Sequence, residues 1–486
     1  MNINPVAHFP QMIAPEKHSG GANIDVFSPY DEHLIATVAS SNEMAVEQAL
    51  CNAAALFASK QDWLTTVHRI AILERAISLM QEQAEALAAL AAEEGGKPII
   101  DSRIEMVRCI DSIRICVDTL RTKSATAPVM GTNTASNHRI AWVEQEPIGV
   151  VLAVSAFNHP LNLIAHQIAP AIAVGCPVII KPAKDTPLSC IQLVKIFHAA
   201  GLPEAWCQWI IPATTALSEA LVSDQRVAFF SFIGSAKVGW YLRSKLAAGT
   251  RCALEHGGVA PVIVAQDVDV DAAMQGFIKG AFYHAGQVCV SIQRMFVHAS
   301  IARDLANKIA QQASALHVGN PLSEKTDVGP LIRASEVKRI QSWVDEAVAS
   351  GGLLLCGGKR VDQHCFAPTV IFGPSASSKV STMEIFGPVV CIYPFTDLDA
   401  AIAQANALEV AFQAAVYTQT IDTALYVSSR LAASTVMVND HTAFRVDWMP
   451  FAGLKHSGLA TGGIPYTMHD MQTEKMTVIY STALKG

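Results

Sequence analysis

Two side chains of this sequence could together carry out nucleophilic chemistry on a carbonyl group. Cys289 lies in the segment 286–291 (GQVCVS), directly after an apolar stretch that predicts a helix. A cysteine at such a junction can be a reactive thiol, although most cysteines are small buried hydrophobic residues. Glu255 ends a short apolar run and is followed by Gly257 and Gly258, which let the backbone pass close to another group. The pair predicts a thiolate nucleophile at Cys289 and a general base at Glu255.

An amide and an ammonium group follow two further apolar runs. Asn158 comes after the run 150–154, and its side chain can donate a hydrogen bond to the oxyanion that forms when a thiolate attacks a carbonyl. Such a donor lowers the barrier by roughly 3 kcal/mol. Lys181 ends the run 178–180, at the edge where ligands collect in open parallel sheets.

The elements that must position these residues alternate in type. Apolar runs separated by helix-length segments predict a parallel sheet in an α/β domain, and they cover 150–154, 178–180, 209–211, 227–232 and 261–264. A second α/β unit is predicted after Asp267, with helices over 271–284 and 302–316 and strands over 389–393 and 414–417. Amphipathic helices are predicted over 66–90, stopped by the segment 95–98 (GGKP), and over 104–120. The polar segment 121–138 predicts an extension away from the core.

Composition bounds the class of protein. The 486 residues are 51% hydrophobic, but Pro, Gly and charges break the apolar runs before they reach membrane-spanning length. The first residues, MNINPVAHFPQ, lack the pattern of a secretory signal. A net charge of −7 with no basic stripe argues against nucleic acid. The eleven cysteines contain no Cys-x-x-Cys pair, which predicts neither a disulfide framework nor a metal site. We expect a cytoplasmic protein with no membrane partner.

A set of motifs in this sequence resembles the aldehyde dehydrogenase superfamily and appears in that family's order. The separations also match: 289 − 255 = 34 between base and nucleophile, and 181 − 158 = 23 between the amide and the lysine. The motifs are Phe157-Asn158-x-Pro160, Lys181-Pro182, Gly234-Ser235, Leu254-Glu255-x-Gly257-Gly258, Gly286-Gln287-x-Cys289, Glu384-x-Phe386-Gly387-Pro388 and Pro450-Phe451.

The resemblance implies a fold and a reaction. The fold is α/β, with a Rossmann-like cofactor domain, an α/β catalytic domain and a small β oligomerisation arm. We expect the NAD(P)-binding domain over 1–125 and 146–257, the catalytic domain over 258–445, and the arm and C-terminal tail over 126–145 and 446–486. The implied reaction oxidises an aldehyde to an acid through a thiohemiacetal and a thioester. A homodimer or homotetramer is expected.

The resemblance also assigns roles in binding NAD or NADP. It places Lys181 at the adenine ribose, Ser235 at the pyrophosphate, and Glu384 with Phe386 at the nicotinamide and its ribose. The remaining expected cofactor residues are Ser155, Ala156, Lys184 and Gly234.

Several positions depart from the commonest family sequence. Lys184 stands where NAD-preferring members often carry Glu, so a 2′-phosphate would meet attraction there, unless Lys184 is only a solvated surface residue. Gln167 replaces a Lys often linked to the active site, and Gly462 stands where some members offer a second base. His256 replaces the usual Leu and either tunes Glu255 or is a structural histidine.

Three further residues concern the substrate. The resemblance places Arg108, His159 and Arg445 near the substrate tunnel, where two cations could clamp a carboxylate, sulfonate or phosphonate. Alternatively, Arg108 pairs with Glu105 and Arg445 with Asp447. The region is similar to that of members acting on lactaldehyde, glyceraldehyde, succinate semialdehyde and phosphonoacetaldehyde, which favours a short polar, possibly anionic, aldehyde.

Two alternative functions stay open. An acylating dehydrogenase would pass the thioester to coenzyme A, but such relatives often lack the base that Glu255 supplies. A catalytically silent binding or structural protein on the same fold would not need the intact set of Cys289, Glu255 and Asn158.

Overall fold

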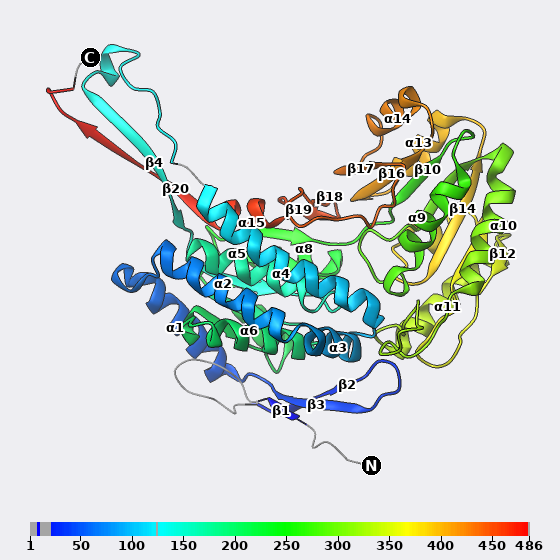
Figure 1. Ribbon diagram of the computed structural model, residues 1–486, viewed down its shortest axis with the longest axis horizontal. Coiled ribbons are helices and arrows are strands. Elements are labelled where there is room, and N and C mark those ends of the chain that lie inside the picture. The colour runs from blue at the N-terminus through cyan, green and yellow to red at the C-terminus, as the bar shows by residue number, and fades with distance from the viewer. Residues whose placement is uncertain (1–6, 10–20, 123–124, 485–486) are drawn as a thin grey trace.

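The computed structural model describes residues 7–9, 21–122 and 125–484, and they form two α/β halves with a two-stranded ribbon that projects from one of them (Figure 1). Most of residues 1–20, on which the expected lack of an export signal rests, lie outside the described residues. None of the helices among the described residues combines the length and the apolar character needed to cross a membrane.

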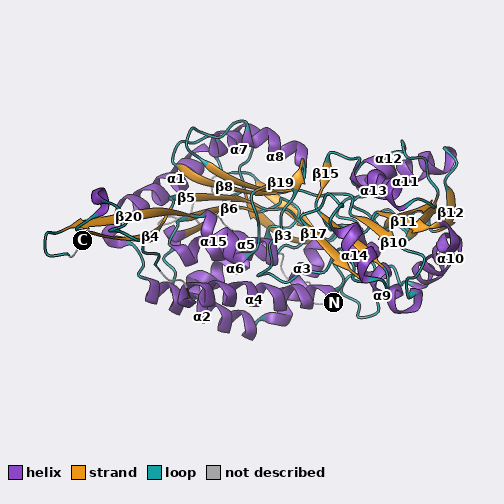
Figure 2. Cartoon of the chain, turned by 90° about the horizontal axis from the view of Figure 1, so that it is seen from above, coloured by secondary structure: helices purple, strands orange, loops and turns teal. Residues whose placement is uncertain are grey.

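The first half contains a six-stranded sheet in the order β19-β9-β8-β5-β6-β7. All neighbouring strands are parallel except β19 and β9. Buried residues of α2 to α6 and α15 pack on one face, and those of α1, α7 and α8 pack on the other (Figure 2). The strands are β5 (Val150–Val154), β6 (Val178–Lys181), β7 (Cys207–Trp209), β8 (Val227–Ile233), β9 (Arg251–Glu255) and β19 (Gly458–Leu459). The helices are α1 (Glu43–Ala58), α2 (Thr66–Glu82), α3 (Ala84–Gly95), α4 (Ile99–Thr122), α5 (Asn162–Val174), α6 (Leu188–Ala199), α7 (Thr215–Val222), α8 (Ala236–Arg243) and α15 (Ile464–Asp470).

The second half contains a seven-stranded sheet in the order β12-β13-β14-β11-β10-β16-β17, of which only the β12–β13 pair is antiparallel. Helices α9 to α11 pack on one face, and α13 with α14 on the other. The strands are β10 (Pro261–Val264), β11 (Arg294–His298), β12 (Leu353–Cys356), β13 (Thr369–Phe372), β14 (Val389–Phe395), β16 (Gln413–Tyr417) and β17 (Thr435–Val438). The helices are α9 (Val270–Phe282), α10 (Ala299–Ala315), α11 (Ala334–Ala349), α12 (Lys379–Thr382), α13 (Leu398–Asn406) and α14 (Ile421–Ser428).

The projecting ribbon pairs β4 (Arg139–Pro147) with β20 (Gln472–Tyr480) in antiparallel register. It extends away from the first half, as the polar segment before it predicted (Figure 1). Large apolar side chains of the ribbon stay exposed, among them Ile140, Met476 and Tyr480. The smaller strands are β1 (Ala7–Phe9), β2 (Asn23–Phe27) and β3 (Leu34–Ala39), which form one sheet, and β15 (Val410–Ala411) with β18 (Leu454–Lys455).

One strand belongs to a different sheet from the one we expected. The run 261–264 forms β10 with the expected bounds, but it pairs with β11 and β16 in the seven-stranded sheet. The interpretation of the apolar pattern, that this run continues the first sheet, is wrong, whereas the domain bounds implied by the resemblance place 261–264 with the second half. Hydrophobic periodicity identifies a buried strand, yet it carries no information about the sheet in which that strand pairs.

The predicted helices differ from the observed ones at their ends. The stretch 66–90 is two helices, α2 and α3, separated at Gln83, and α3 extends to Gly95. Gly96 then takes a left-handed conformation, with φ of 74°, which suits a glycine that ends a helix. Helix α4 begins at Ile99, five residues before the predicted start at 104. Helix α9 ends at Phe282 because the chain turns through positive φ at His284 and Ala285.

Candidate active site

One cavity of about 760 Å³ takes its walls from both sheets. Every site residue expected from the sequence lines it. They are Cys289, Glu255, Asn158, Lys181, Lys184, Gly234, Ser235, Glu384, Phe386, Ser155, Ala156, Arg108, His159 and Arg445. The fold therefore brings together residues that lie as far apart in the chain as α4 and the segment after β17.

The loop of Cys289 is fixed by backbone and amide contacts. The carbonyl of Cys289 accepts a hydrogen bond from the Gly258 amide at 3.2 Å. The neighbouring side chain of Gln287 donates from Nε2 to the Pro330 carbonyl at 3.2 Å and accepts from the Ile332 amide at 3.0 Å. These bonds hold the loop of Cys289 against two other segments, which gives the sulfur a defined position.

The electrostatic surroundings of Cys289 disfavour a resting thiolate. Burial raises the pKa of its thiol well above the usual range, the carboxylate of Glu255 adds to this, and Arg445 opposes it. Cys289 is therefore a protonated thiol in the free chain.

Glu255 is the last residue of β9, and its carboxylate faces Arg445 with 3.8 Å between Oε1 and Nη1. Burial raises the pKa of Glu255, Arg445 lowers it, and the negative charge of Asp447 raises it. A carboxylate with a raised pKa is a better proton acceptor near neutral pH than an exposed one. The position at a strand end agrees with the expected one.

Asn158 is oriented by its own hydrogen bond. It lies in the loop after β5, is buried, and donates from Nδ2 to the Gln287 carbonyl at 2.8 Å. An amide nitrogen carries two hydrogens, so this bond uses one and leaves the other for an oxyanion. The bond ties the Asn158 amide to the residue two positions before Cys289.

The cavity residues that we expect at the cofactor include cations and unpaired polar atoms. Lys181 ends β6, and its pKa falls to about 8 through burial and the nearby charge of Lys184. Ser235 occupies the position before the first residue of α8. The hydroxyl of Ser155 and Oε1 of Glu384 are buried and have no hydrogen-bond partner among the described residues. Burial raises the pKa of Glu384 to about 8.

These features fit a dinucleotide. The two lysines can bind a phosphate or a ribose phosphate. The unpaired hydroxyl of Ser155 and carboxyl oxygen of Glu384 can form hydrogen bonds with ribose hydroxyls. A Cβ at position 257 would lie 1.6 Å from Oε1 of Glu384, so a side chain there would displace this carboxyl group.

His256 contacts the turn at Gly234 and not the carboxylate beside it in sequence. Its Nδ1 lies 2.8 Å from the Gly234 carbonyl, and its ring packs against those of Phe232 and Trp240. Burial lowers the pKa of His256, so the ring is neutral and Nδ1 donates. Of our two interpretations, the structural one agrees with these contacts.

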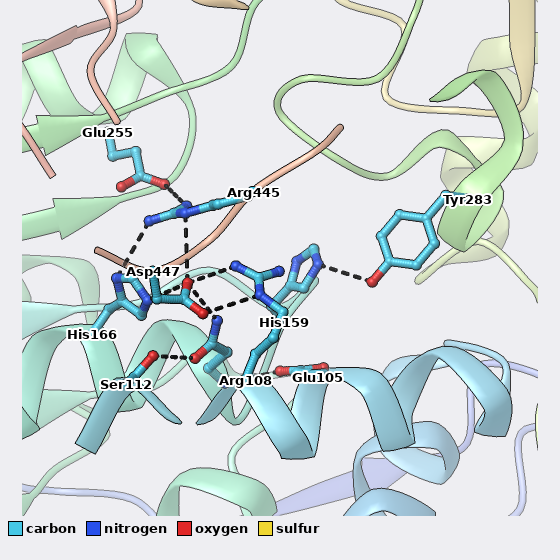
Figure 3. A network of polar contacts seen from close by, with 10 residues as sticks. Glu105, Arg108, Ser112, His159, His166, Glu255, Tyr283, Arg445 and Asp447 are labelled. Carbon is cyan, nitrogen blue, oxygen red and sulfur yellow. Dashed lines mark hydrogen bonds and ion pairs between the residues drawn. The ribbon is translucent and has the colours of Figure 1, made fainter. Parts of the chain in front are cut away.

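Arg108 and Arg445, which we expect at the substrate, line the cavity, and both contact the buried carboxylate of Asp447 behind its wall, a residue that the sequence indicated only as a neighbour of Arg445. Asp447 accepts from Arg108 at 2.6 and 3.1 Å, from His166 Nε2 at 2.8 Å and from Asn162 at 3.3 Å (Figure 3). Nε of Arg445 lies 3.7 Å from the same carboxylate. Despite burial, which raises it, His166 and Arg108 hold the pKa of Asp447 far below its usual value.

The suggested pairing of Arg108 with Glu105 is wrong. Glu105 forms a buried ion pair with Lys97 and accepts hydrogen bonds from the amides of Leu161 and Asn162. Although they lie three residues apart on α4, Glu105 and Arg108 thus contact different partners. The suggested pairing of Arg445 with Asp447 does occur, as an ion pair without a hydrogen bond.

His159 lines the same cavity and lies beside Tyr283. Its Nε2 is 3.5 Å from the Tyr283 hydroxyl, and burial together with the charge of Lys97 lowers its pKa well below the usual value. A neutral imidazole can donate or accept one hydrogen bond but supplies no charge. His159 thus lines the substrate end as a polar group, while the positive charge comes from the arginines.

The fold and the groups that line the cavity fit an α/β oxidoreductase that binds a dinucleotide, with Cys289 as its expected nucleophile. A model of the aldehyde dehydrogenase family matches residues 16–477, and the chain belongs to this family. It is 32% identical over 479 residues to the 3-sulfolactaldehyde dehydrogenase of Priestia aryabhattai, covering 98% of this chain and 99% of that protein.

Solved structures agree over the whole length. Aldehyde dehydrogenase 21 from Physcomitrella patens, in complex with the reaction product succinate, matches with a TM-score of 0.94 and 32% identity, covering 99% of this chain and 100% of that one. The glyceraldehyde-3-phosphate dehydrogenase of Methanocaldococcus jannaschii, complexed with NADP, matches with a TM-score of 0.90 and 34% identity, covering 94% and 99%.

Proposed function

We propose that this chain oxidises a short aldehyde with an anionic far end to the carboxylic acid, using NAD or NADP. The observation that carries the proposal is the placement of Arg108 and Arg445 in the same cavity as Cys289 and Glu255. Two arginines share the single carboxylate of Asp447, so a positive charge stays available for a carboxylate or sulfonate when Glu255 is not ionised. Succinate in one related structure and a sulfonated aldehyde in the name of one relative support this class.

Cys289, Asn158 and Glu255 each carry a different step of the proposed oxidation. The Cys289 thiol releases its proton to solvent and its sulfur forms the bond to the carbonyl carbon, while the Asn158 amide with the Cys289 amide stabilises the oxyanion. A dinucleotide held by Lys181, Ser235 and Glu384 would supply the hydride acceptor. Glu255 then takes a proton from the water that hydrolyses the thioester, which releases the acid.

Several finer features belong to the same proposal. Lys184 beside Lys181 supports acceptance of the 2′-phosphate of NADP as well as NAD. The exposed apolar side chains of the β4–β20 ribbon support a homodimer or homotetramer joined through that ribbon. Eleven free cysteines support a reducing compartment, the cytoplasm. We infer that the six-stranded half binds the cofactor and the seven-stranded half supplies the nucleophile.

A reduced-cofactor absorbance screen tests the proposal. NAD and NADP are each offered with short neutral aldehydes and with carboxylated or sulfonated ones, without coenzyme A. The expected result is turnover that favours the anionic aldehydes, with free acid as product. Turnover only with coenzyme A would identify an acylating dehydrogenase, and the absence of turnover and of thiol labelling at Cys289 would indicate a silent binding protein.

A further inference from the structure

Arg445 lies between the general base and the substrate end of the cavity. Its guanidinium stands over the ring of Phe451 at 3.5 Å from the centroid, and only 10% of its side chain is exposed. Nη1 lies 3.8 Å from Glu255 and Nε lies 3.7 Å from Asp447, both beyond hydrogen-bond range (Figure 3). Nε has no hydrogen-bond partner among the described residues. Its charge is therefore loosely compensated, and donors remain for a ligand.

The two carboxylates beside Arg445 differ in how firmly they are held. Asp447 accepts hydrogen bonds from Arg108, His166 and Asn162, which fixes it in place. Glu255 faces the cavity at the end of β9 and meets Arg445 only through the longer ion pair. An incoming anion can replace Glu255 at Arg445 at lower cost than it can replace Asp447 at Arg108.

We propose that Glu255 and the anionic end of the substrate are alternative counterions of Arg445, so that a seated anion separates Arg445 from the general base. This inference rests on the proposed function, because it requires an anionic substrate. Once the anion takes the donors of Arg445, Glu255 loses its positive neighbour and takes up a proton from solvent more readily. Above its raised pKa it is a stronger base towards water. A neutral aldehyde leaves the contact between Arg445 and Glu255 unchanged.

Other titratable groups face Glu255 from each neighbouring segment. Arg445 and Asp447 come from the segment after β17, and Cys289 from the loop before β11. The side chain of Glu384 lies against Gly257, and its negative charge, like that of Glu255, raises the pKa of the Cys289 thiol. All of these groups are present with either kind of ligand, so a comparison of an anionic with a neutral ligand isolates the effect at Arg445.

His166 lies on the far side of Arg445, with 3.3 Å between its Nδ1 and Nη2 of the arginine. Burial lowers the pKa of His166, and the carboxylate of Asp447 opposes this. An anion at Arg445 could also favour its protonation. A variant that removes the carboxylate of Glu255 but keeps His166 separates the two sources of proton uptake.

Calorimetry of an unreactive anion tests the inference. Propane-1-sulfonate keeps its charge at every relevant pH, so protons taken up on its binding belong to the protein. Titrations of the full-length chain in buffers of different ionisation enthalpy should show uptake of about half a proton at the optimal pH for a pKa rise of about one unit. Propanamide, the neutral control, should bind without proton uptake.

Three outcomes decide between the proposals. Loss of the uptake in Glu255→Gln, with the sulfonate still bound, supports the exchange of counterions. Sulfonate binding without proton uptake in the unaltered chain, or equal uptake in Glu255→Gln, overturns the inference but leaves the anionic substrate class intact. If propane-1-sulfonate binds no better than propanamide, the anionic substrate class fails, and the inference fails with it.

Discussion

The two ends of the cavity are assembled in different ways. At the cofactor end, Lys181 is the last residue of β6 and Ser235 directly precedes α8, so local chain direction places each group. At the substrate end, Arg108 and Asp447 are 339 residues apart and meet only in the folded chain. Under the proposed function, short motifs would set the reaction and the cofactor, whereas long-range ion pairs would set the substrate.

The largest expected effect on activity comes from replacing the proposed nucleophile. Replacing Cys289 with Ala removes the atom that forms the thiohemiacetal, so oxidation should fall by about 10⁴-fold or more. Steady-state formation of reduced cofactor measures this loss. Cofactor binding, followed by fluorescence, should stay unchanged because the cofactor end is intact, and appreciable turnover by Cys289→Ala would rule out the proposed nucleophile.

The second change removes the centre of the substrate end. Asp447→Ala leaves Arg108 without its buried counterion, and we expect a loss of about 2–4 kcal/mol in the free energy of unfolding at neutral pH. The native pKa of Asp447 is depressed, so its contribution is present above the unfolded pKa and is lost as the pH falls through the acid range. Denaturant unfolding at several pH values measures both effects.

A matched control separates this network from an ordinary surface charge. Asp271 pairs with Lys308 but its side chain is 90% exposed. Asp271→Ala should change stability by no more than about 0.5 kcal/mol. Equal losses in the two variants would mean that Asp447 is no more than a surface partner.

The third change tests the ligand preference of the substrate end. Arg108→Ala removes one of two cations, and the KM for an anionic aldehyde should rise about 10- to 100-fold. The KM for propanal should change far less, because propanal presents no charge. Initial-rate kinetics with both aldehydes measure the ratio, and the same rise for both would contradict an anion clamp.

The smallest change concerns the cofactor end. Lys184→Ala removes a cation near Lys181, and the affinity for NADP should fall by about 10-fold, with a smaller effect on NAD. Titration of each dinucleotide by fluorescence measures the two dissociation constants. A lysine that is only a solvated surface residue would leave both constants unchanged.

The contrast between local motifs and long-range contacts also explains how much of the fold and of the site could be predicted from the sequence. Strands β5 and β10 were expected with the bounds they have, because continuous apolar runs mark buried strands. The sheet to which β10 belongs did not follow from the apolar pattern, since pairing partners lie far away in the chain, and only the domain bounds implied by the resemblance placed 261–264 with the second half. All expected site residues line one cavity, but the central place of Asp447 was missed. The nearby Arg445 was the one feature of the local sequence that pointed to Asp447. The contacts of Asp447 with Arg108 and His166 could not be predicted, because they form only in the folded chain.

One measurement tests the central claim that Cys289 is acylated and Glu255 promotes hydrolysis of the acyl group. In Glu255→Gln, an anionic aldehyde and oxidised cofactor should give one turnover of reduced cofactor, after which the thioester persists. Intact-protein mass spectrometry after acid quenching should then show the added acyl mass, and peptide mapping should place it on Cys289. Reduced cofactor formed over many turnovers without an adduct, or an adduct on another cysteine, would contradict the account.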